Sequence, residues 1–327
     1  MGEMTYGEAA CLALRQEMQR DARVWALGED LGSIGGIAGQ YRGLQEEFGR
    51  SRICDTPISE STIMGAAVGA AICGTRPVVE LRYADFALCA TDEIVNQAAK
   101  IRYMFNGQAR VPLVVRQPIG IQKGCAAQHS QSTEAWWVHV PGLVVVAPAT
   151  PADNHGLLKA AIRCDDPVVY LEHKELWPAR GAVDSQQAPL PLGKAQLVLK
   201  GDDLTIVTWS RMRHVCELAC GALAQQGLRA ELIDLRTLWP WDREQVLESV
   251  RRTGRLLVVH EAVRVGGFGA EIAAEVSEVL WRELKGPVRR LAGPRSPVPY
   301  AEPLENRMRI SPDQVAGMAL EMIKEKR

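Results

Sequence analysis

The segment "LVVVAPATPADNHGLLKAAIRCDDPVVYLE", residues 143–172, decides the fold class. A valine-rich run is followed by "ADNHGLLKAAIR", which has helical spacing of apolar residues, and then by a second apolar run, "PVVYLE". This strand–helix–strand order is typical of βαβ units in a mainly parallel sheet. The nearly continuous apolar run at 111–115, "VPLVV", fits strands that helices cover on both faces. The sequence therefore predicts an α/β fold.

The same alternation extends along the chain in both directions. It includes "VWALG" (24–28), a helix at 61–74, "PVVELRY" (77–83), a helix at 91–105, and later "LTIVTWS" (204–210), "AELIDL" (230–235) and "RLLVVHE" (255–261). A chain of 327 residues is long enough for two cores. We expect a parallel-sheet domain over residues 1–180, a linker at 181–200 and a smaller α/β domain over 201–327.

Composition excludes several classes of protein. A net charge of -1 gives no electrostatic footprint for nucleic acid or an anionic membrane. The N-terminal region lacks a signal-peptide pattern, and no apolar run has the roughly 18 residues that span a bilayer. We expect a cytoplasmic protein with no nucleic-acid or membrane partner. The eight cysteines form no C-x-x-C pair, so buried free thiols are expected rather than disulfides or zinc.

Glycine clusters at 32–39 ("GSIGGIAG") and 265–271 ("VGGFGAE") do not meet the strand, G-x-G-x-x-G, helix order of dinucleotide sites. The second cluster is expected to make a turn and to open a helix whose amides could meet an anion. The sequence contains no G-x-S-x-G elbow, P-loop or H-E-x-x-H, which argues against common hydrolase, phosphotransferase and zinc-protease functions.

Ionisable residues in apolar surroundings are more informative. Glu29 ends the strand "VWALGED", Glu60 follows "DTPIS", and His129 lies in a loop after "VPLVVRQ". Ligands collect just past the carboxyl ends of parallel strands, so the three residues are expected at one rim. Each also has a structural explanation: a solvated turn, a helix-start carboxylate or a loop hydrogen bond. The helix after Glu60 carries Gly65 and Gly69 on one face, which suggests that something large lies against it.

Six segments, in order, carry a resemblance to a known family. They are "GEDLGSIGG" (28–36), "DTPISES" (55–61), "NQAAKIRYMFNGQ" (96–108), "AAQHSQSTEAWWVHVPGLVVVAP" (126–148), "LLKAAIRCDDPVVYLEHK" (157–174) and "EPLE" (302–305). Over nearly the whole length the chain resembles the β subunit of the thiamine-diphosphate-dependent decarboxylase component of 2-oxo-acid dehydrogenase complexes. That family includes the pyruvate, branched-chain 2-oxo acid and acetoin enzymes and is transketolase-like.

The resemblance implies roles for the residues already singled out. The glutamate of the "TPISE" motif, here Glu60, would share a proton with the aminopyrimidine ring of thiamine diphosphate. Phe86 would pack on that ring, with ordinary core packing as the alternative. His129 would assist the reaction and acyl transfer to a lipoyl group. Glu29 would belong to the same site, as part of a hydrogen-bonded path between paired active sites.

The resemblance also implies partners and ions. The family holds Mg²⁺ and the diphosphate with a G-D-G motif, which is absent here, so a separate α subunit would hold them in an α2β2 heterotetramer. Some members bind K⁺ through carbonyl groups that match Leu113, Ala161, Cys164 and Asp166, although Cys164 departs from the expected acid. The C-terminal domain would resemble that of transketolase, contribute to β–β contacts and dock a lipoyl-bearing acyltransferase core.

The expected reaction is oxidative decarboxylation of a 2-oxo acid with reductive acylation of the lipoyl group. Acetoin cleavage is the nearest alternative, because "RYMFNGQ" and "YLEHK" look somewhat closer to the acetoin branch. A non-catalytic adapter that docks to the acyltransferase core and a free-standing transketolase-like enzyme are further alternatives. The missing magnesium motif argues against the last of these.

Overall fold

The computed structural model describes residues 2–325, which form two compact units. The first unit runs to Ile119 and resumes over Trp136–Leu192. The second contains Gly120–Ala135 and begins again at Gly193. By its contacts, the segment after β5 therefore belongs to the second unit. No sequence pattern indicated this assignment.

The sheet of the first unit is parallel, as predicted. Its strands lie in the order β6 (Val144–Val146), β7 (Val168–His173), β5 (Val114–Ile119), β4 (Arg76–Glu80), β2 (Val24–Gly28) and β3 (Ile53–Asp55). A separate antiparallel pair joins β1 (Gly2–Thr5) to β8 (Arg180–Val183).

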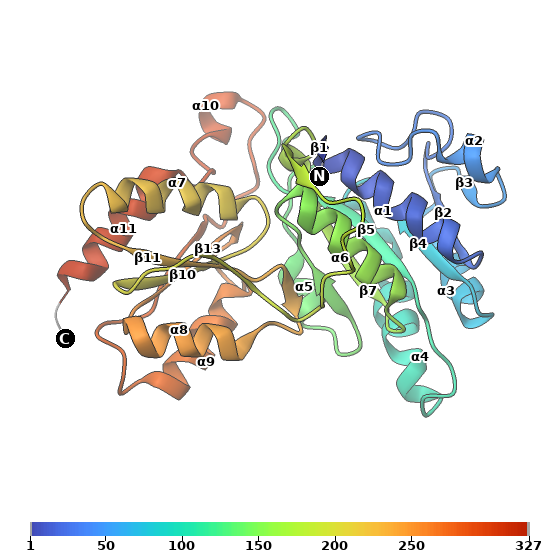
Figure 1. Cartoon of the computed structure of the whole chain (residues 1–327). Coiled ribbons are helices and arrows are strands. Elements are labelled where there is room, and N and C mark those ends of the chain that lie inside the picture. The colour runs from blue at the N-terminus through green and yellow to red at the C-terminus, as the bar shows by residue number, and fades with distance from the viewer. Residues whose placement is uncertain (1, 326–327) are drawn as a thin grey trace. The chain divides into compact units, whose positions relative to one another are not determined.

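The helices up to residue 192 cover both faces of this sheet. They are α1 (Tyr6–Arg20), α2 (Leu44–Phe48), α3 (Glu60–Ile72), α4 (Ala99–Met104) and α6 (Pro151–Arg163), with short turns η1 (Phe86–Ala90), η2 (Glu93–Ala98) and η3 (Lys174–Leu176). The boundary between the two units falls within α5 (Glu134–Val138). Figure 1 shows α1 and α6 side by side on one face of the sheet. Helix α6 begins where the opening sequence predicts, because the Thr150 hydroxyl caps the Asp153 amide and Pro151 occupies the first turn.

The second unit has its own sheet and core. Its strands lie in the order β14 (Arg289–Gly293), β13 (Leu256–Val263), β10 (Leu204–Thr208), β11 (Ala230–Asp234) and β9 (Gln196–Leu199), and β9 alone in this order is antiparallel. A further short strand, β12, spans Thr237–Trp239. Figure 1 shows α7 (Met212–Ala224) and α11 (Pro312–Lys324) on one face, with α8 (Arg243–Thr253) and α9 (Gly269–Leu280) on the other. Helix α10 is Glu302–Glu305.

The structure adds detail to two regions of the sequence, residues 91–105 and 181–200. The single helix expected over 91–105 consists of the π-helix η2 followed by α4, because a π-turn adds a residue per turn that apolar spacing does not reveal. The range 181–200, expected to hold a linker and an entry strand of the second domain, contains most of β8 and all of β9, which pair with β1 and β11. The irregular part of that range contains the prolines Pro189 and Pro191.

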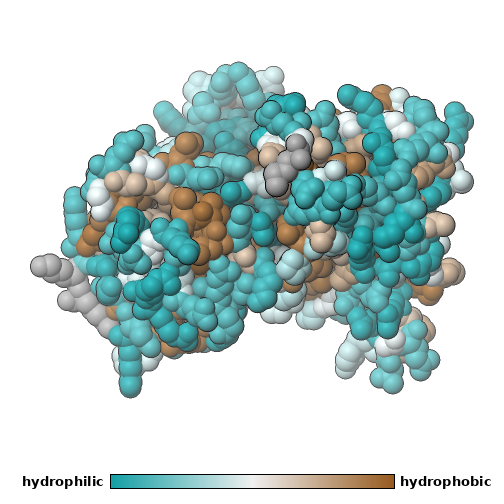
Figure 2. Space-filling view, viewed as in Figure 1, coloured by the Kyte–Doolittle hydropathy of each residue, from teal (hydrophilic) through white to brown (hydrophobic). Residues whose placement is uncertain are grey.

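The surface is consistent with the balanced composition. Figure 2 shows a mostly hydrophilic face with separate hydrophobic areas. Among the described residues, no helix combines the length and apolar character needed to cross a membrane. Within residues 2–325 there is also no cluster of three His, Cys, Asp or Glu side chains that could hold a metal ion.

Candidate active site

Three of the predicted site residues follow three adjacent parallel strands of the first unit. Glu29 comes directly after β2, Glu60 opens α3 after β3, and Phe86 opens η1 after β4. Strand β2 lies between β3 and β4 and is parallel to both. Parallel strands end at the same edge, so these three residues belong to one rim of the sheet.

Backbone geometry at the end of β2 draws two of the predicted segments together. The Thr56 amide donates to the Gly28 carbonyl oxygen at 3.0 Å, which fixes the start of "TPISE" beside "GED". A Cβ on Gly28 would lie 2.6 Å from the Glu80 carbonyl oxygen. Glycine is therefore required immediately before Glu29, because any larger residue would push β2 away from β4.

The carboxyl group of Glu29 is suited to hold a proton. Partial burial and the nearby negative charge of Glu60 raise the pKa of Glu29, while Arg82 lowers it. Arg82 pairs with Asp30 at 2.9 Å rather than with Glu29. The electrostatic effect of Glu60 on Glu29 is consistent with two acidic side chains at this rim.

Helix α3 leaves its small-residue face uncovered. Glu60 is half-buried at the first turn, and Ile58 just before it has 78% of its surface exposed. Within residues 2–325, a Cβ on Gly69 would have no atom within 4 Å, and on Gly65 would meet only the Glu93 Cγ at 4.0 Å. The large group expected against this face is therefore not supplied by the described part of the chain.

Phe86 presents a half-buried aromatic ring at the same rim. Its ring meets that of Tyr83 edge-on, with centroids 5.4 Å apart and planes at 86°. The Lys174 ammonium lies 5.1 Å from the Tyr83 ring centroid, and this cation–π contact helps to hold the Tyr83 ring in place. Phe86 therefore packs against the Tyr83 ring, and part of its own ring stays exposed.

A buried polar network under the rim was missed by the sequence reasoning. Arg116, which is fully buried, forms a bidentate pair with Glu172 at 2.8 and 2.9 Å. The Gln40 amide donates to both oxygens of Glu80 at 2.9 Å, and the Arg116 guanidinium lies 5.1 Å from the Tyr41 ring centroid. Burial raises the pKa of Glu80. These contacts hold the loop after Glu29 against β4 and β5. The signal was present as charged residues inside apolar strands, "VVELRY" and "LVVRQ".

His129 lies in the other unit. Its segment, Gly120–Ala135, directly follows β5 but makes its contacts with residues beyond 192. His129 is half-buried and the neighbouring Ser130 is buried. The structure thus brings Glu29, Glu60 and Phe86 to one rim of the first unit and assigns His129 to the second.

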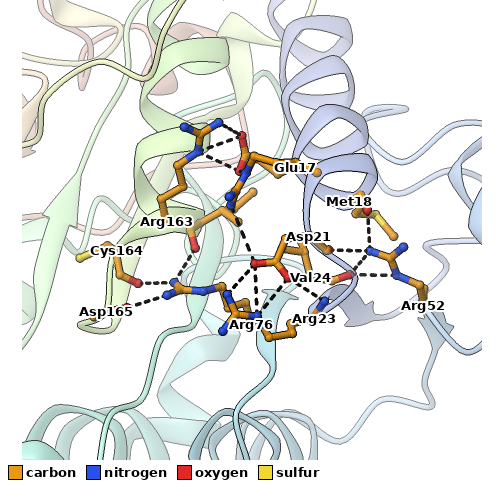
Figure 3. Close-up of polar contacts among 12 residues, drawn as sticks. Glu17, Met18, Asp21, Arg23, Val24, Arg52, Arg76, Arg163, Cys164 and Asp165 are labelled. Carbon is orange, nitrogen blue, oxygen red and sulfur yellow. Dashed lines mark hydrogen bonds and ion pairs between the residues drawn. The ribbon is translucent and has the colours of Figure 1, made fainter.

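Of the residues whose carbonyl groups were suggested for K⁺, Leu113 precedes β5, Ala161 lies near the end of α6, and Cys164 and Asp166 follow that helix. Figure 3 shows Arg76 approaching Cys164 and Asp165. Arg76 donates to the Cys164 carbonyl at 3.0 Å and to the Asp165 carboxylate at 2.5 Å. The Leu113 and Ala161 carbonyls each accept one backbone amide. These two keep a free lone pair, but the Cys164 carbonyl already faces a guanidinium. The potassium site stays a prediction.

Comparison with known proteins decides the family. The transketolase pyrimidine-binding domain model matches residues 2–179, and the transketolase C-terminal domain model matches residues 193–315. The chain is 42% identical to the 2-oxoisovalerate dehydrogenase β subunit of Bacillus subtilis, covering 98% of this chain and 99% of that one. The chain belongs to the family of E1 β subunits of 2-oxo acid dehydrogenases.

Other relatives of this E1 β chain span the family's branches. It is 43% identical to the β subunit of acetoin:2,6-dichlorophenolindophenol oxidoreductase of Cupriavidus necator, covering 95% of both chains. It is 44% identical to a mitochondrial pyruvate dehydrogenase E1 β subunit of Arabidopsis thaliana, covering 93% of this chain. A solved split-gene transketolase, described as an inactive β4 tetramer, has the same fold, with a TM-score of 0.79 and 23% identity over both full chains.

Proposed function

We propose that this chain is the β subunit of a thiamine-diphosphate-dependent 2-oxo-acid dehydrogenase, active together with an α subunit in an α2β2 heterotetramer. The reaction is oxidative decarboxylation of a 2-oxo acid with reductive acylation of a lipoyl group on an acyltransferase core. The observation that carries the proposal is the shared rim of Glu29 and Glu60 in a chain whose full-length relatives are E1 β subunits.

The residues at the rim fit the pyrimidine part of the cofactor. When bound, thiamine diphosphate supplies a carbon nucleophile that attacks the oxo group. Glu60 offers a carboxyl group that can exchange a proton with a ring nitrogen, and Phe86 offers a partly covered aromatic face. Glu29, with its raised pKa, can hold a second proton beside Glu60.

The second unit contributes His129, whose imidazole ring can give and take protons at the substrate. Its segment also contains Lys123, which is exposed in an ion pair, and Glu134, which is buried against Trp209, so His129 is its candidate acid–base group. These residues offer proton transfer and ring packing, and the chain's own sequence contains no G-D-G motif for a diphosphate and Mg²⁺. This division of labour supports an α partner that holds the metal.

Exposed apolar side chains also support the proposal of an α subunit. Ile58, Tyr103 and Phe105 expose 78%, 88% and 57% of their surfaces, and Gly69 presents an uncovered helix face. Large exposed apolar groups of this kind are typical of protein interfaces. Their position in "DTPISES" and "RYMFNGQ" places them within two segments that carry the family resemblance.

Acetoin cleavage is the second candidate function. The identity to the acetoin enzyme's β subunit, 43%, is close to the 42% identity to the 2-oxoisovalerate enzyme's β subunit. The proposed chemistry of Glu29, Glu60 and His129 serves both reactions, so these residues do not discriminate between the substrates. The acetoin branch is therefore no better supported than the 2-oxo acid branch.

The test is co-expression with the α subunit encoded nearest to this chain. The purified complex is assayed with pyruvate, branched-chain 2-oxo acids and acetoin, using an artificial electron acceptor, with and without thiamine diphosphate and Mg²⁺. Cofactor-dependent turnover of one substrate identifies the reaction. A well-formed complex that turns over none of them would favour the adapter, and turnover by the chain alone would favour a free-standing enzyme.

Glu60→Gln provides the sharpest variant. It keeps the size of the side chain but cannot exchange the proton, so kcat should fall roughly 10²–10⁴-fold while the complex still forms. Glu46→Gln, on the exposed face of α2, is the matched control. Full activity of Glu60→Gln would revive the adapter function. Replacing KCl with NaCl in the same assay tests the potassium prediction.

A further inference from the structure

The segment that carries His129 is fastened to one edge of the second unit's sheet. The Ile121 amide donates to the Glu261 carboxylate at 2.7 Å, and the Gly124 amide donates to the Glu305 carboxylate at 3.0 Å. Between them, the Lys123 ammonium forms an exposed ion pair with Glu302 at 3.0 Å. The first half of the segment is thus held by carboxylates from β13 and α10.

The second half of the segment has a buried attachment of its own. The Trp209 indole N–H donates to the Glu134 carboxylate at 3.1 Å, and both side chains are at most 2% exposed. Trp209 comes directly after β10, whose neighbour β13 carries Glu261 near its end. The two attachments therefore belong to the same carboxyl edge, because β10 and β13 are parallel. The Gly120 amide also donates to the Gln131 carbonyl at 3.1 Å, which closes the segment into a loop around His129.

Trp209 is itself fixed by aromatic packing. Its ring stacks on that of His260 at 5.2 Å with an angle of 11°, and Phe268 lies 5.9 Å away. A Cβ on Gly267 or Gly269 would lie 2.6 or 2.7 Å from the His260 ring. The glycines of "VGGFGAE" therefore permit the backbone to pack on His260. The cluster also opens a helix, as expected, because α9 begins at Gly269.

Glu134 is costly to bury without a function. Burial raises its pKa to about 7, and within residues 2–325 its second carboxylate oxygen has no hydrogen-bond partner. A hydrophobic residue would pack in this position at lower cost. The carboxyl group is therefore better explained by its hydrogen bond from the Trp209 indole, which attaches the end of the loop.

From these contacts we infer that Glu134 is a positioning residue. Its hydrogen bond from Trp209 fixes the His129 loop to the sheet of the C-terminal domain, so that this domain sets the orientation of a group proposed to act on the substrate. The inference rests on the proposed function for its catalytic consequence. The attachment of the loop can be measured without it.

The first experiment measures amide hydrogen exchange in the α2β2 complex. Trp209→Phe removes the N–H donor and keeps an aromatic ring beside His260, and Glu134→Leu removes the acceptor. Exchange in residues 121–131 should rise in both, while the remote amides of α6 stay unchanged. Glu302→Gln breaks only the exposed ion pair and is the control, with little expected effect. Unchanged exchange in 121–131 for both Trp209→Phe and Glu134→Leu would overturn the inference.

The second experiment uses activity. Trp209→Phe and Glu134→Leu should each lower kcat roughly tenfold to a hundredfold with KM changed less than about twofold, because the loop is displaced rather than removed. Glu134→Gln retains an oxygen acceptor for the indole and should restore most of kcat. In a His129→Ala background, Trp209→Phe should lower the residual rate no further, since the two changes act through one group.

The outcomes separate the two proposals. An equal loss of kcat from Trp209→Phe with and without His129 would overturn the positioning role, even if the enzyme is active. A wild-type complex that shows no turnover would contradict the proposed function, while the exchange experiment would still decide whether Glu134 and Trp209 hold the loop.

Discussion

At the scale of single residues, the conformation of Gly28 determines where Glu29 lies. A Cβ at Gly28 would clash with the Glu80 carbonyl oxygen at 2.6 Å, whereas Gly69 faces open space within the described chain. Gly28→Ala should therefore destabilise the protein by about 1–3 kcal/mol through overpacking. Gly69→Ala should stabilise the isolated chain by up to about 1 kcal/mol through helix propensity. Urea denaturation of both variants measures the difference, and equal effects of the same sign would contradict this account.

Glu134 makes stability depend on pH. Burial raises its pKa from 4.5 to about 7, with Trp209 opposing and the charge of Glu261 reinforcing the shift. The folded state therefore binds this proton more tightly than the unfolded chain. The resulting stabilisation is complete below pH 4.5 and is lost as the pH rises through 7. The glutamine in Glu134→Gln does not titrate. The stability of this variant relative to the wild type should therefore increase as the pH rises from 4.5 to 7, by up to about 3 kcal/mol.

Urea midpoints of the wild type and the Gln variant, measured from pH 5 to pH 8, give this difference directly. Taking the difference removes the contribution of His260, whose pKa burial lowers to about 4 and which acts in the opposite direction. Glu302→Gln, an exposed carboxyl group, should give a flat difference over the same range. A flat difference for Glu134→Gln as well would mean that its carboxyl group titrates normally.

At the scale of elements, the network across β4, β5 and β7 joins the sheet to the loop after Glu29. Arg116 lies beside Glu172 and Glu80 with no exposure to solvent. Arg116→Leu would leave two carboxyl groups buried without their cation and should cost about 3–5 kcal/mol. The double variant Arg116→Leu with Glu172→Leu should recover part of that loss. Arg15→Leu, from a half-exposed pair with Glu47, should cost no more than about 1 kcal/mol and serves as the control.

These elements also show what the sequence could predict. Strand and helix alternation was readable, because buried parallel strands and amphipathic helices leave distinct apolar patterns. Strand order led us to expect Glu29, Glu60 and His129 at one rim, since parallel strands end together. The structure gives Glu29 and Glu60 a common rim, whereas the segment of His129 belongs to the second unit. The π-turn at η2 left no such pattern, and the attachment of the His129 loop depends on Glu261, Glu305 and Trp209, which are distant in sequence.

At the scale of the whole molecule, the chain exposes features that a partner would cover. Ile58, Tyr103 and Phe105 are exposed apolar side chains, and helix α3 presents Gly69 outward. In the absence of the α subunit these exposed groups should promote self-association, because large exposed apolar side chains are typical of protein interfaces. We expect light scattering to detect oligomers of the purified β chain. When the α subunit is added, the measured mass should become that of one defined α2β2 heterotetramer. Tyr103→Ser with Phe105→Ser should weaken both assemblies, whereas Leu218→Ser, an equally exposed apolar residue on α7, should weaken neither. A monomeric wild-type chain that still binds the α subunit would show that the exposed side chains serve the heterotetramer alone, and a chain that binds no α subunit would contradict the half-site argument.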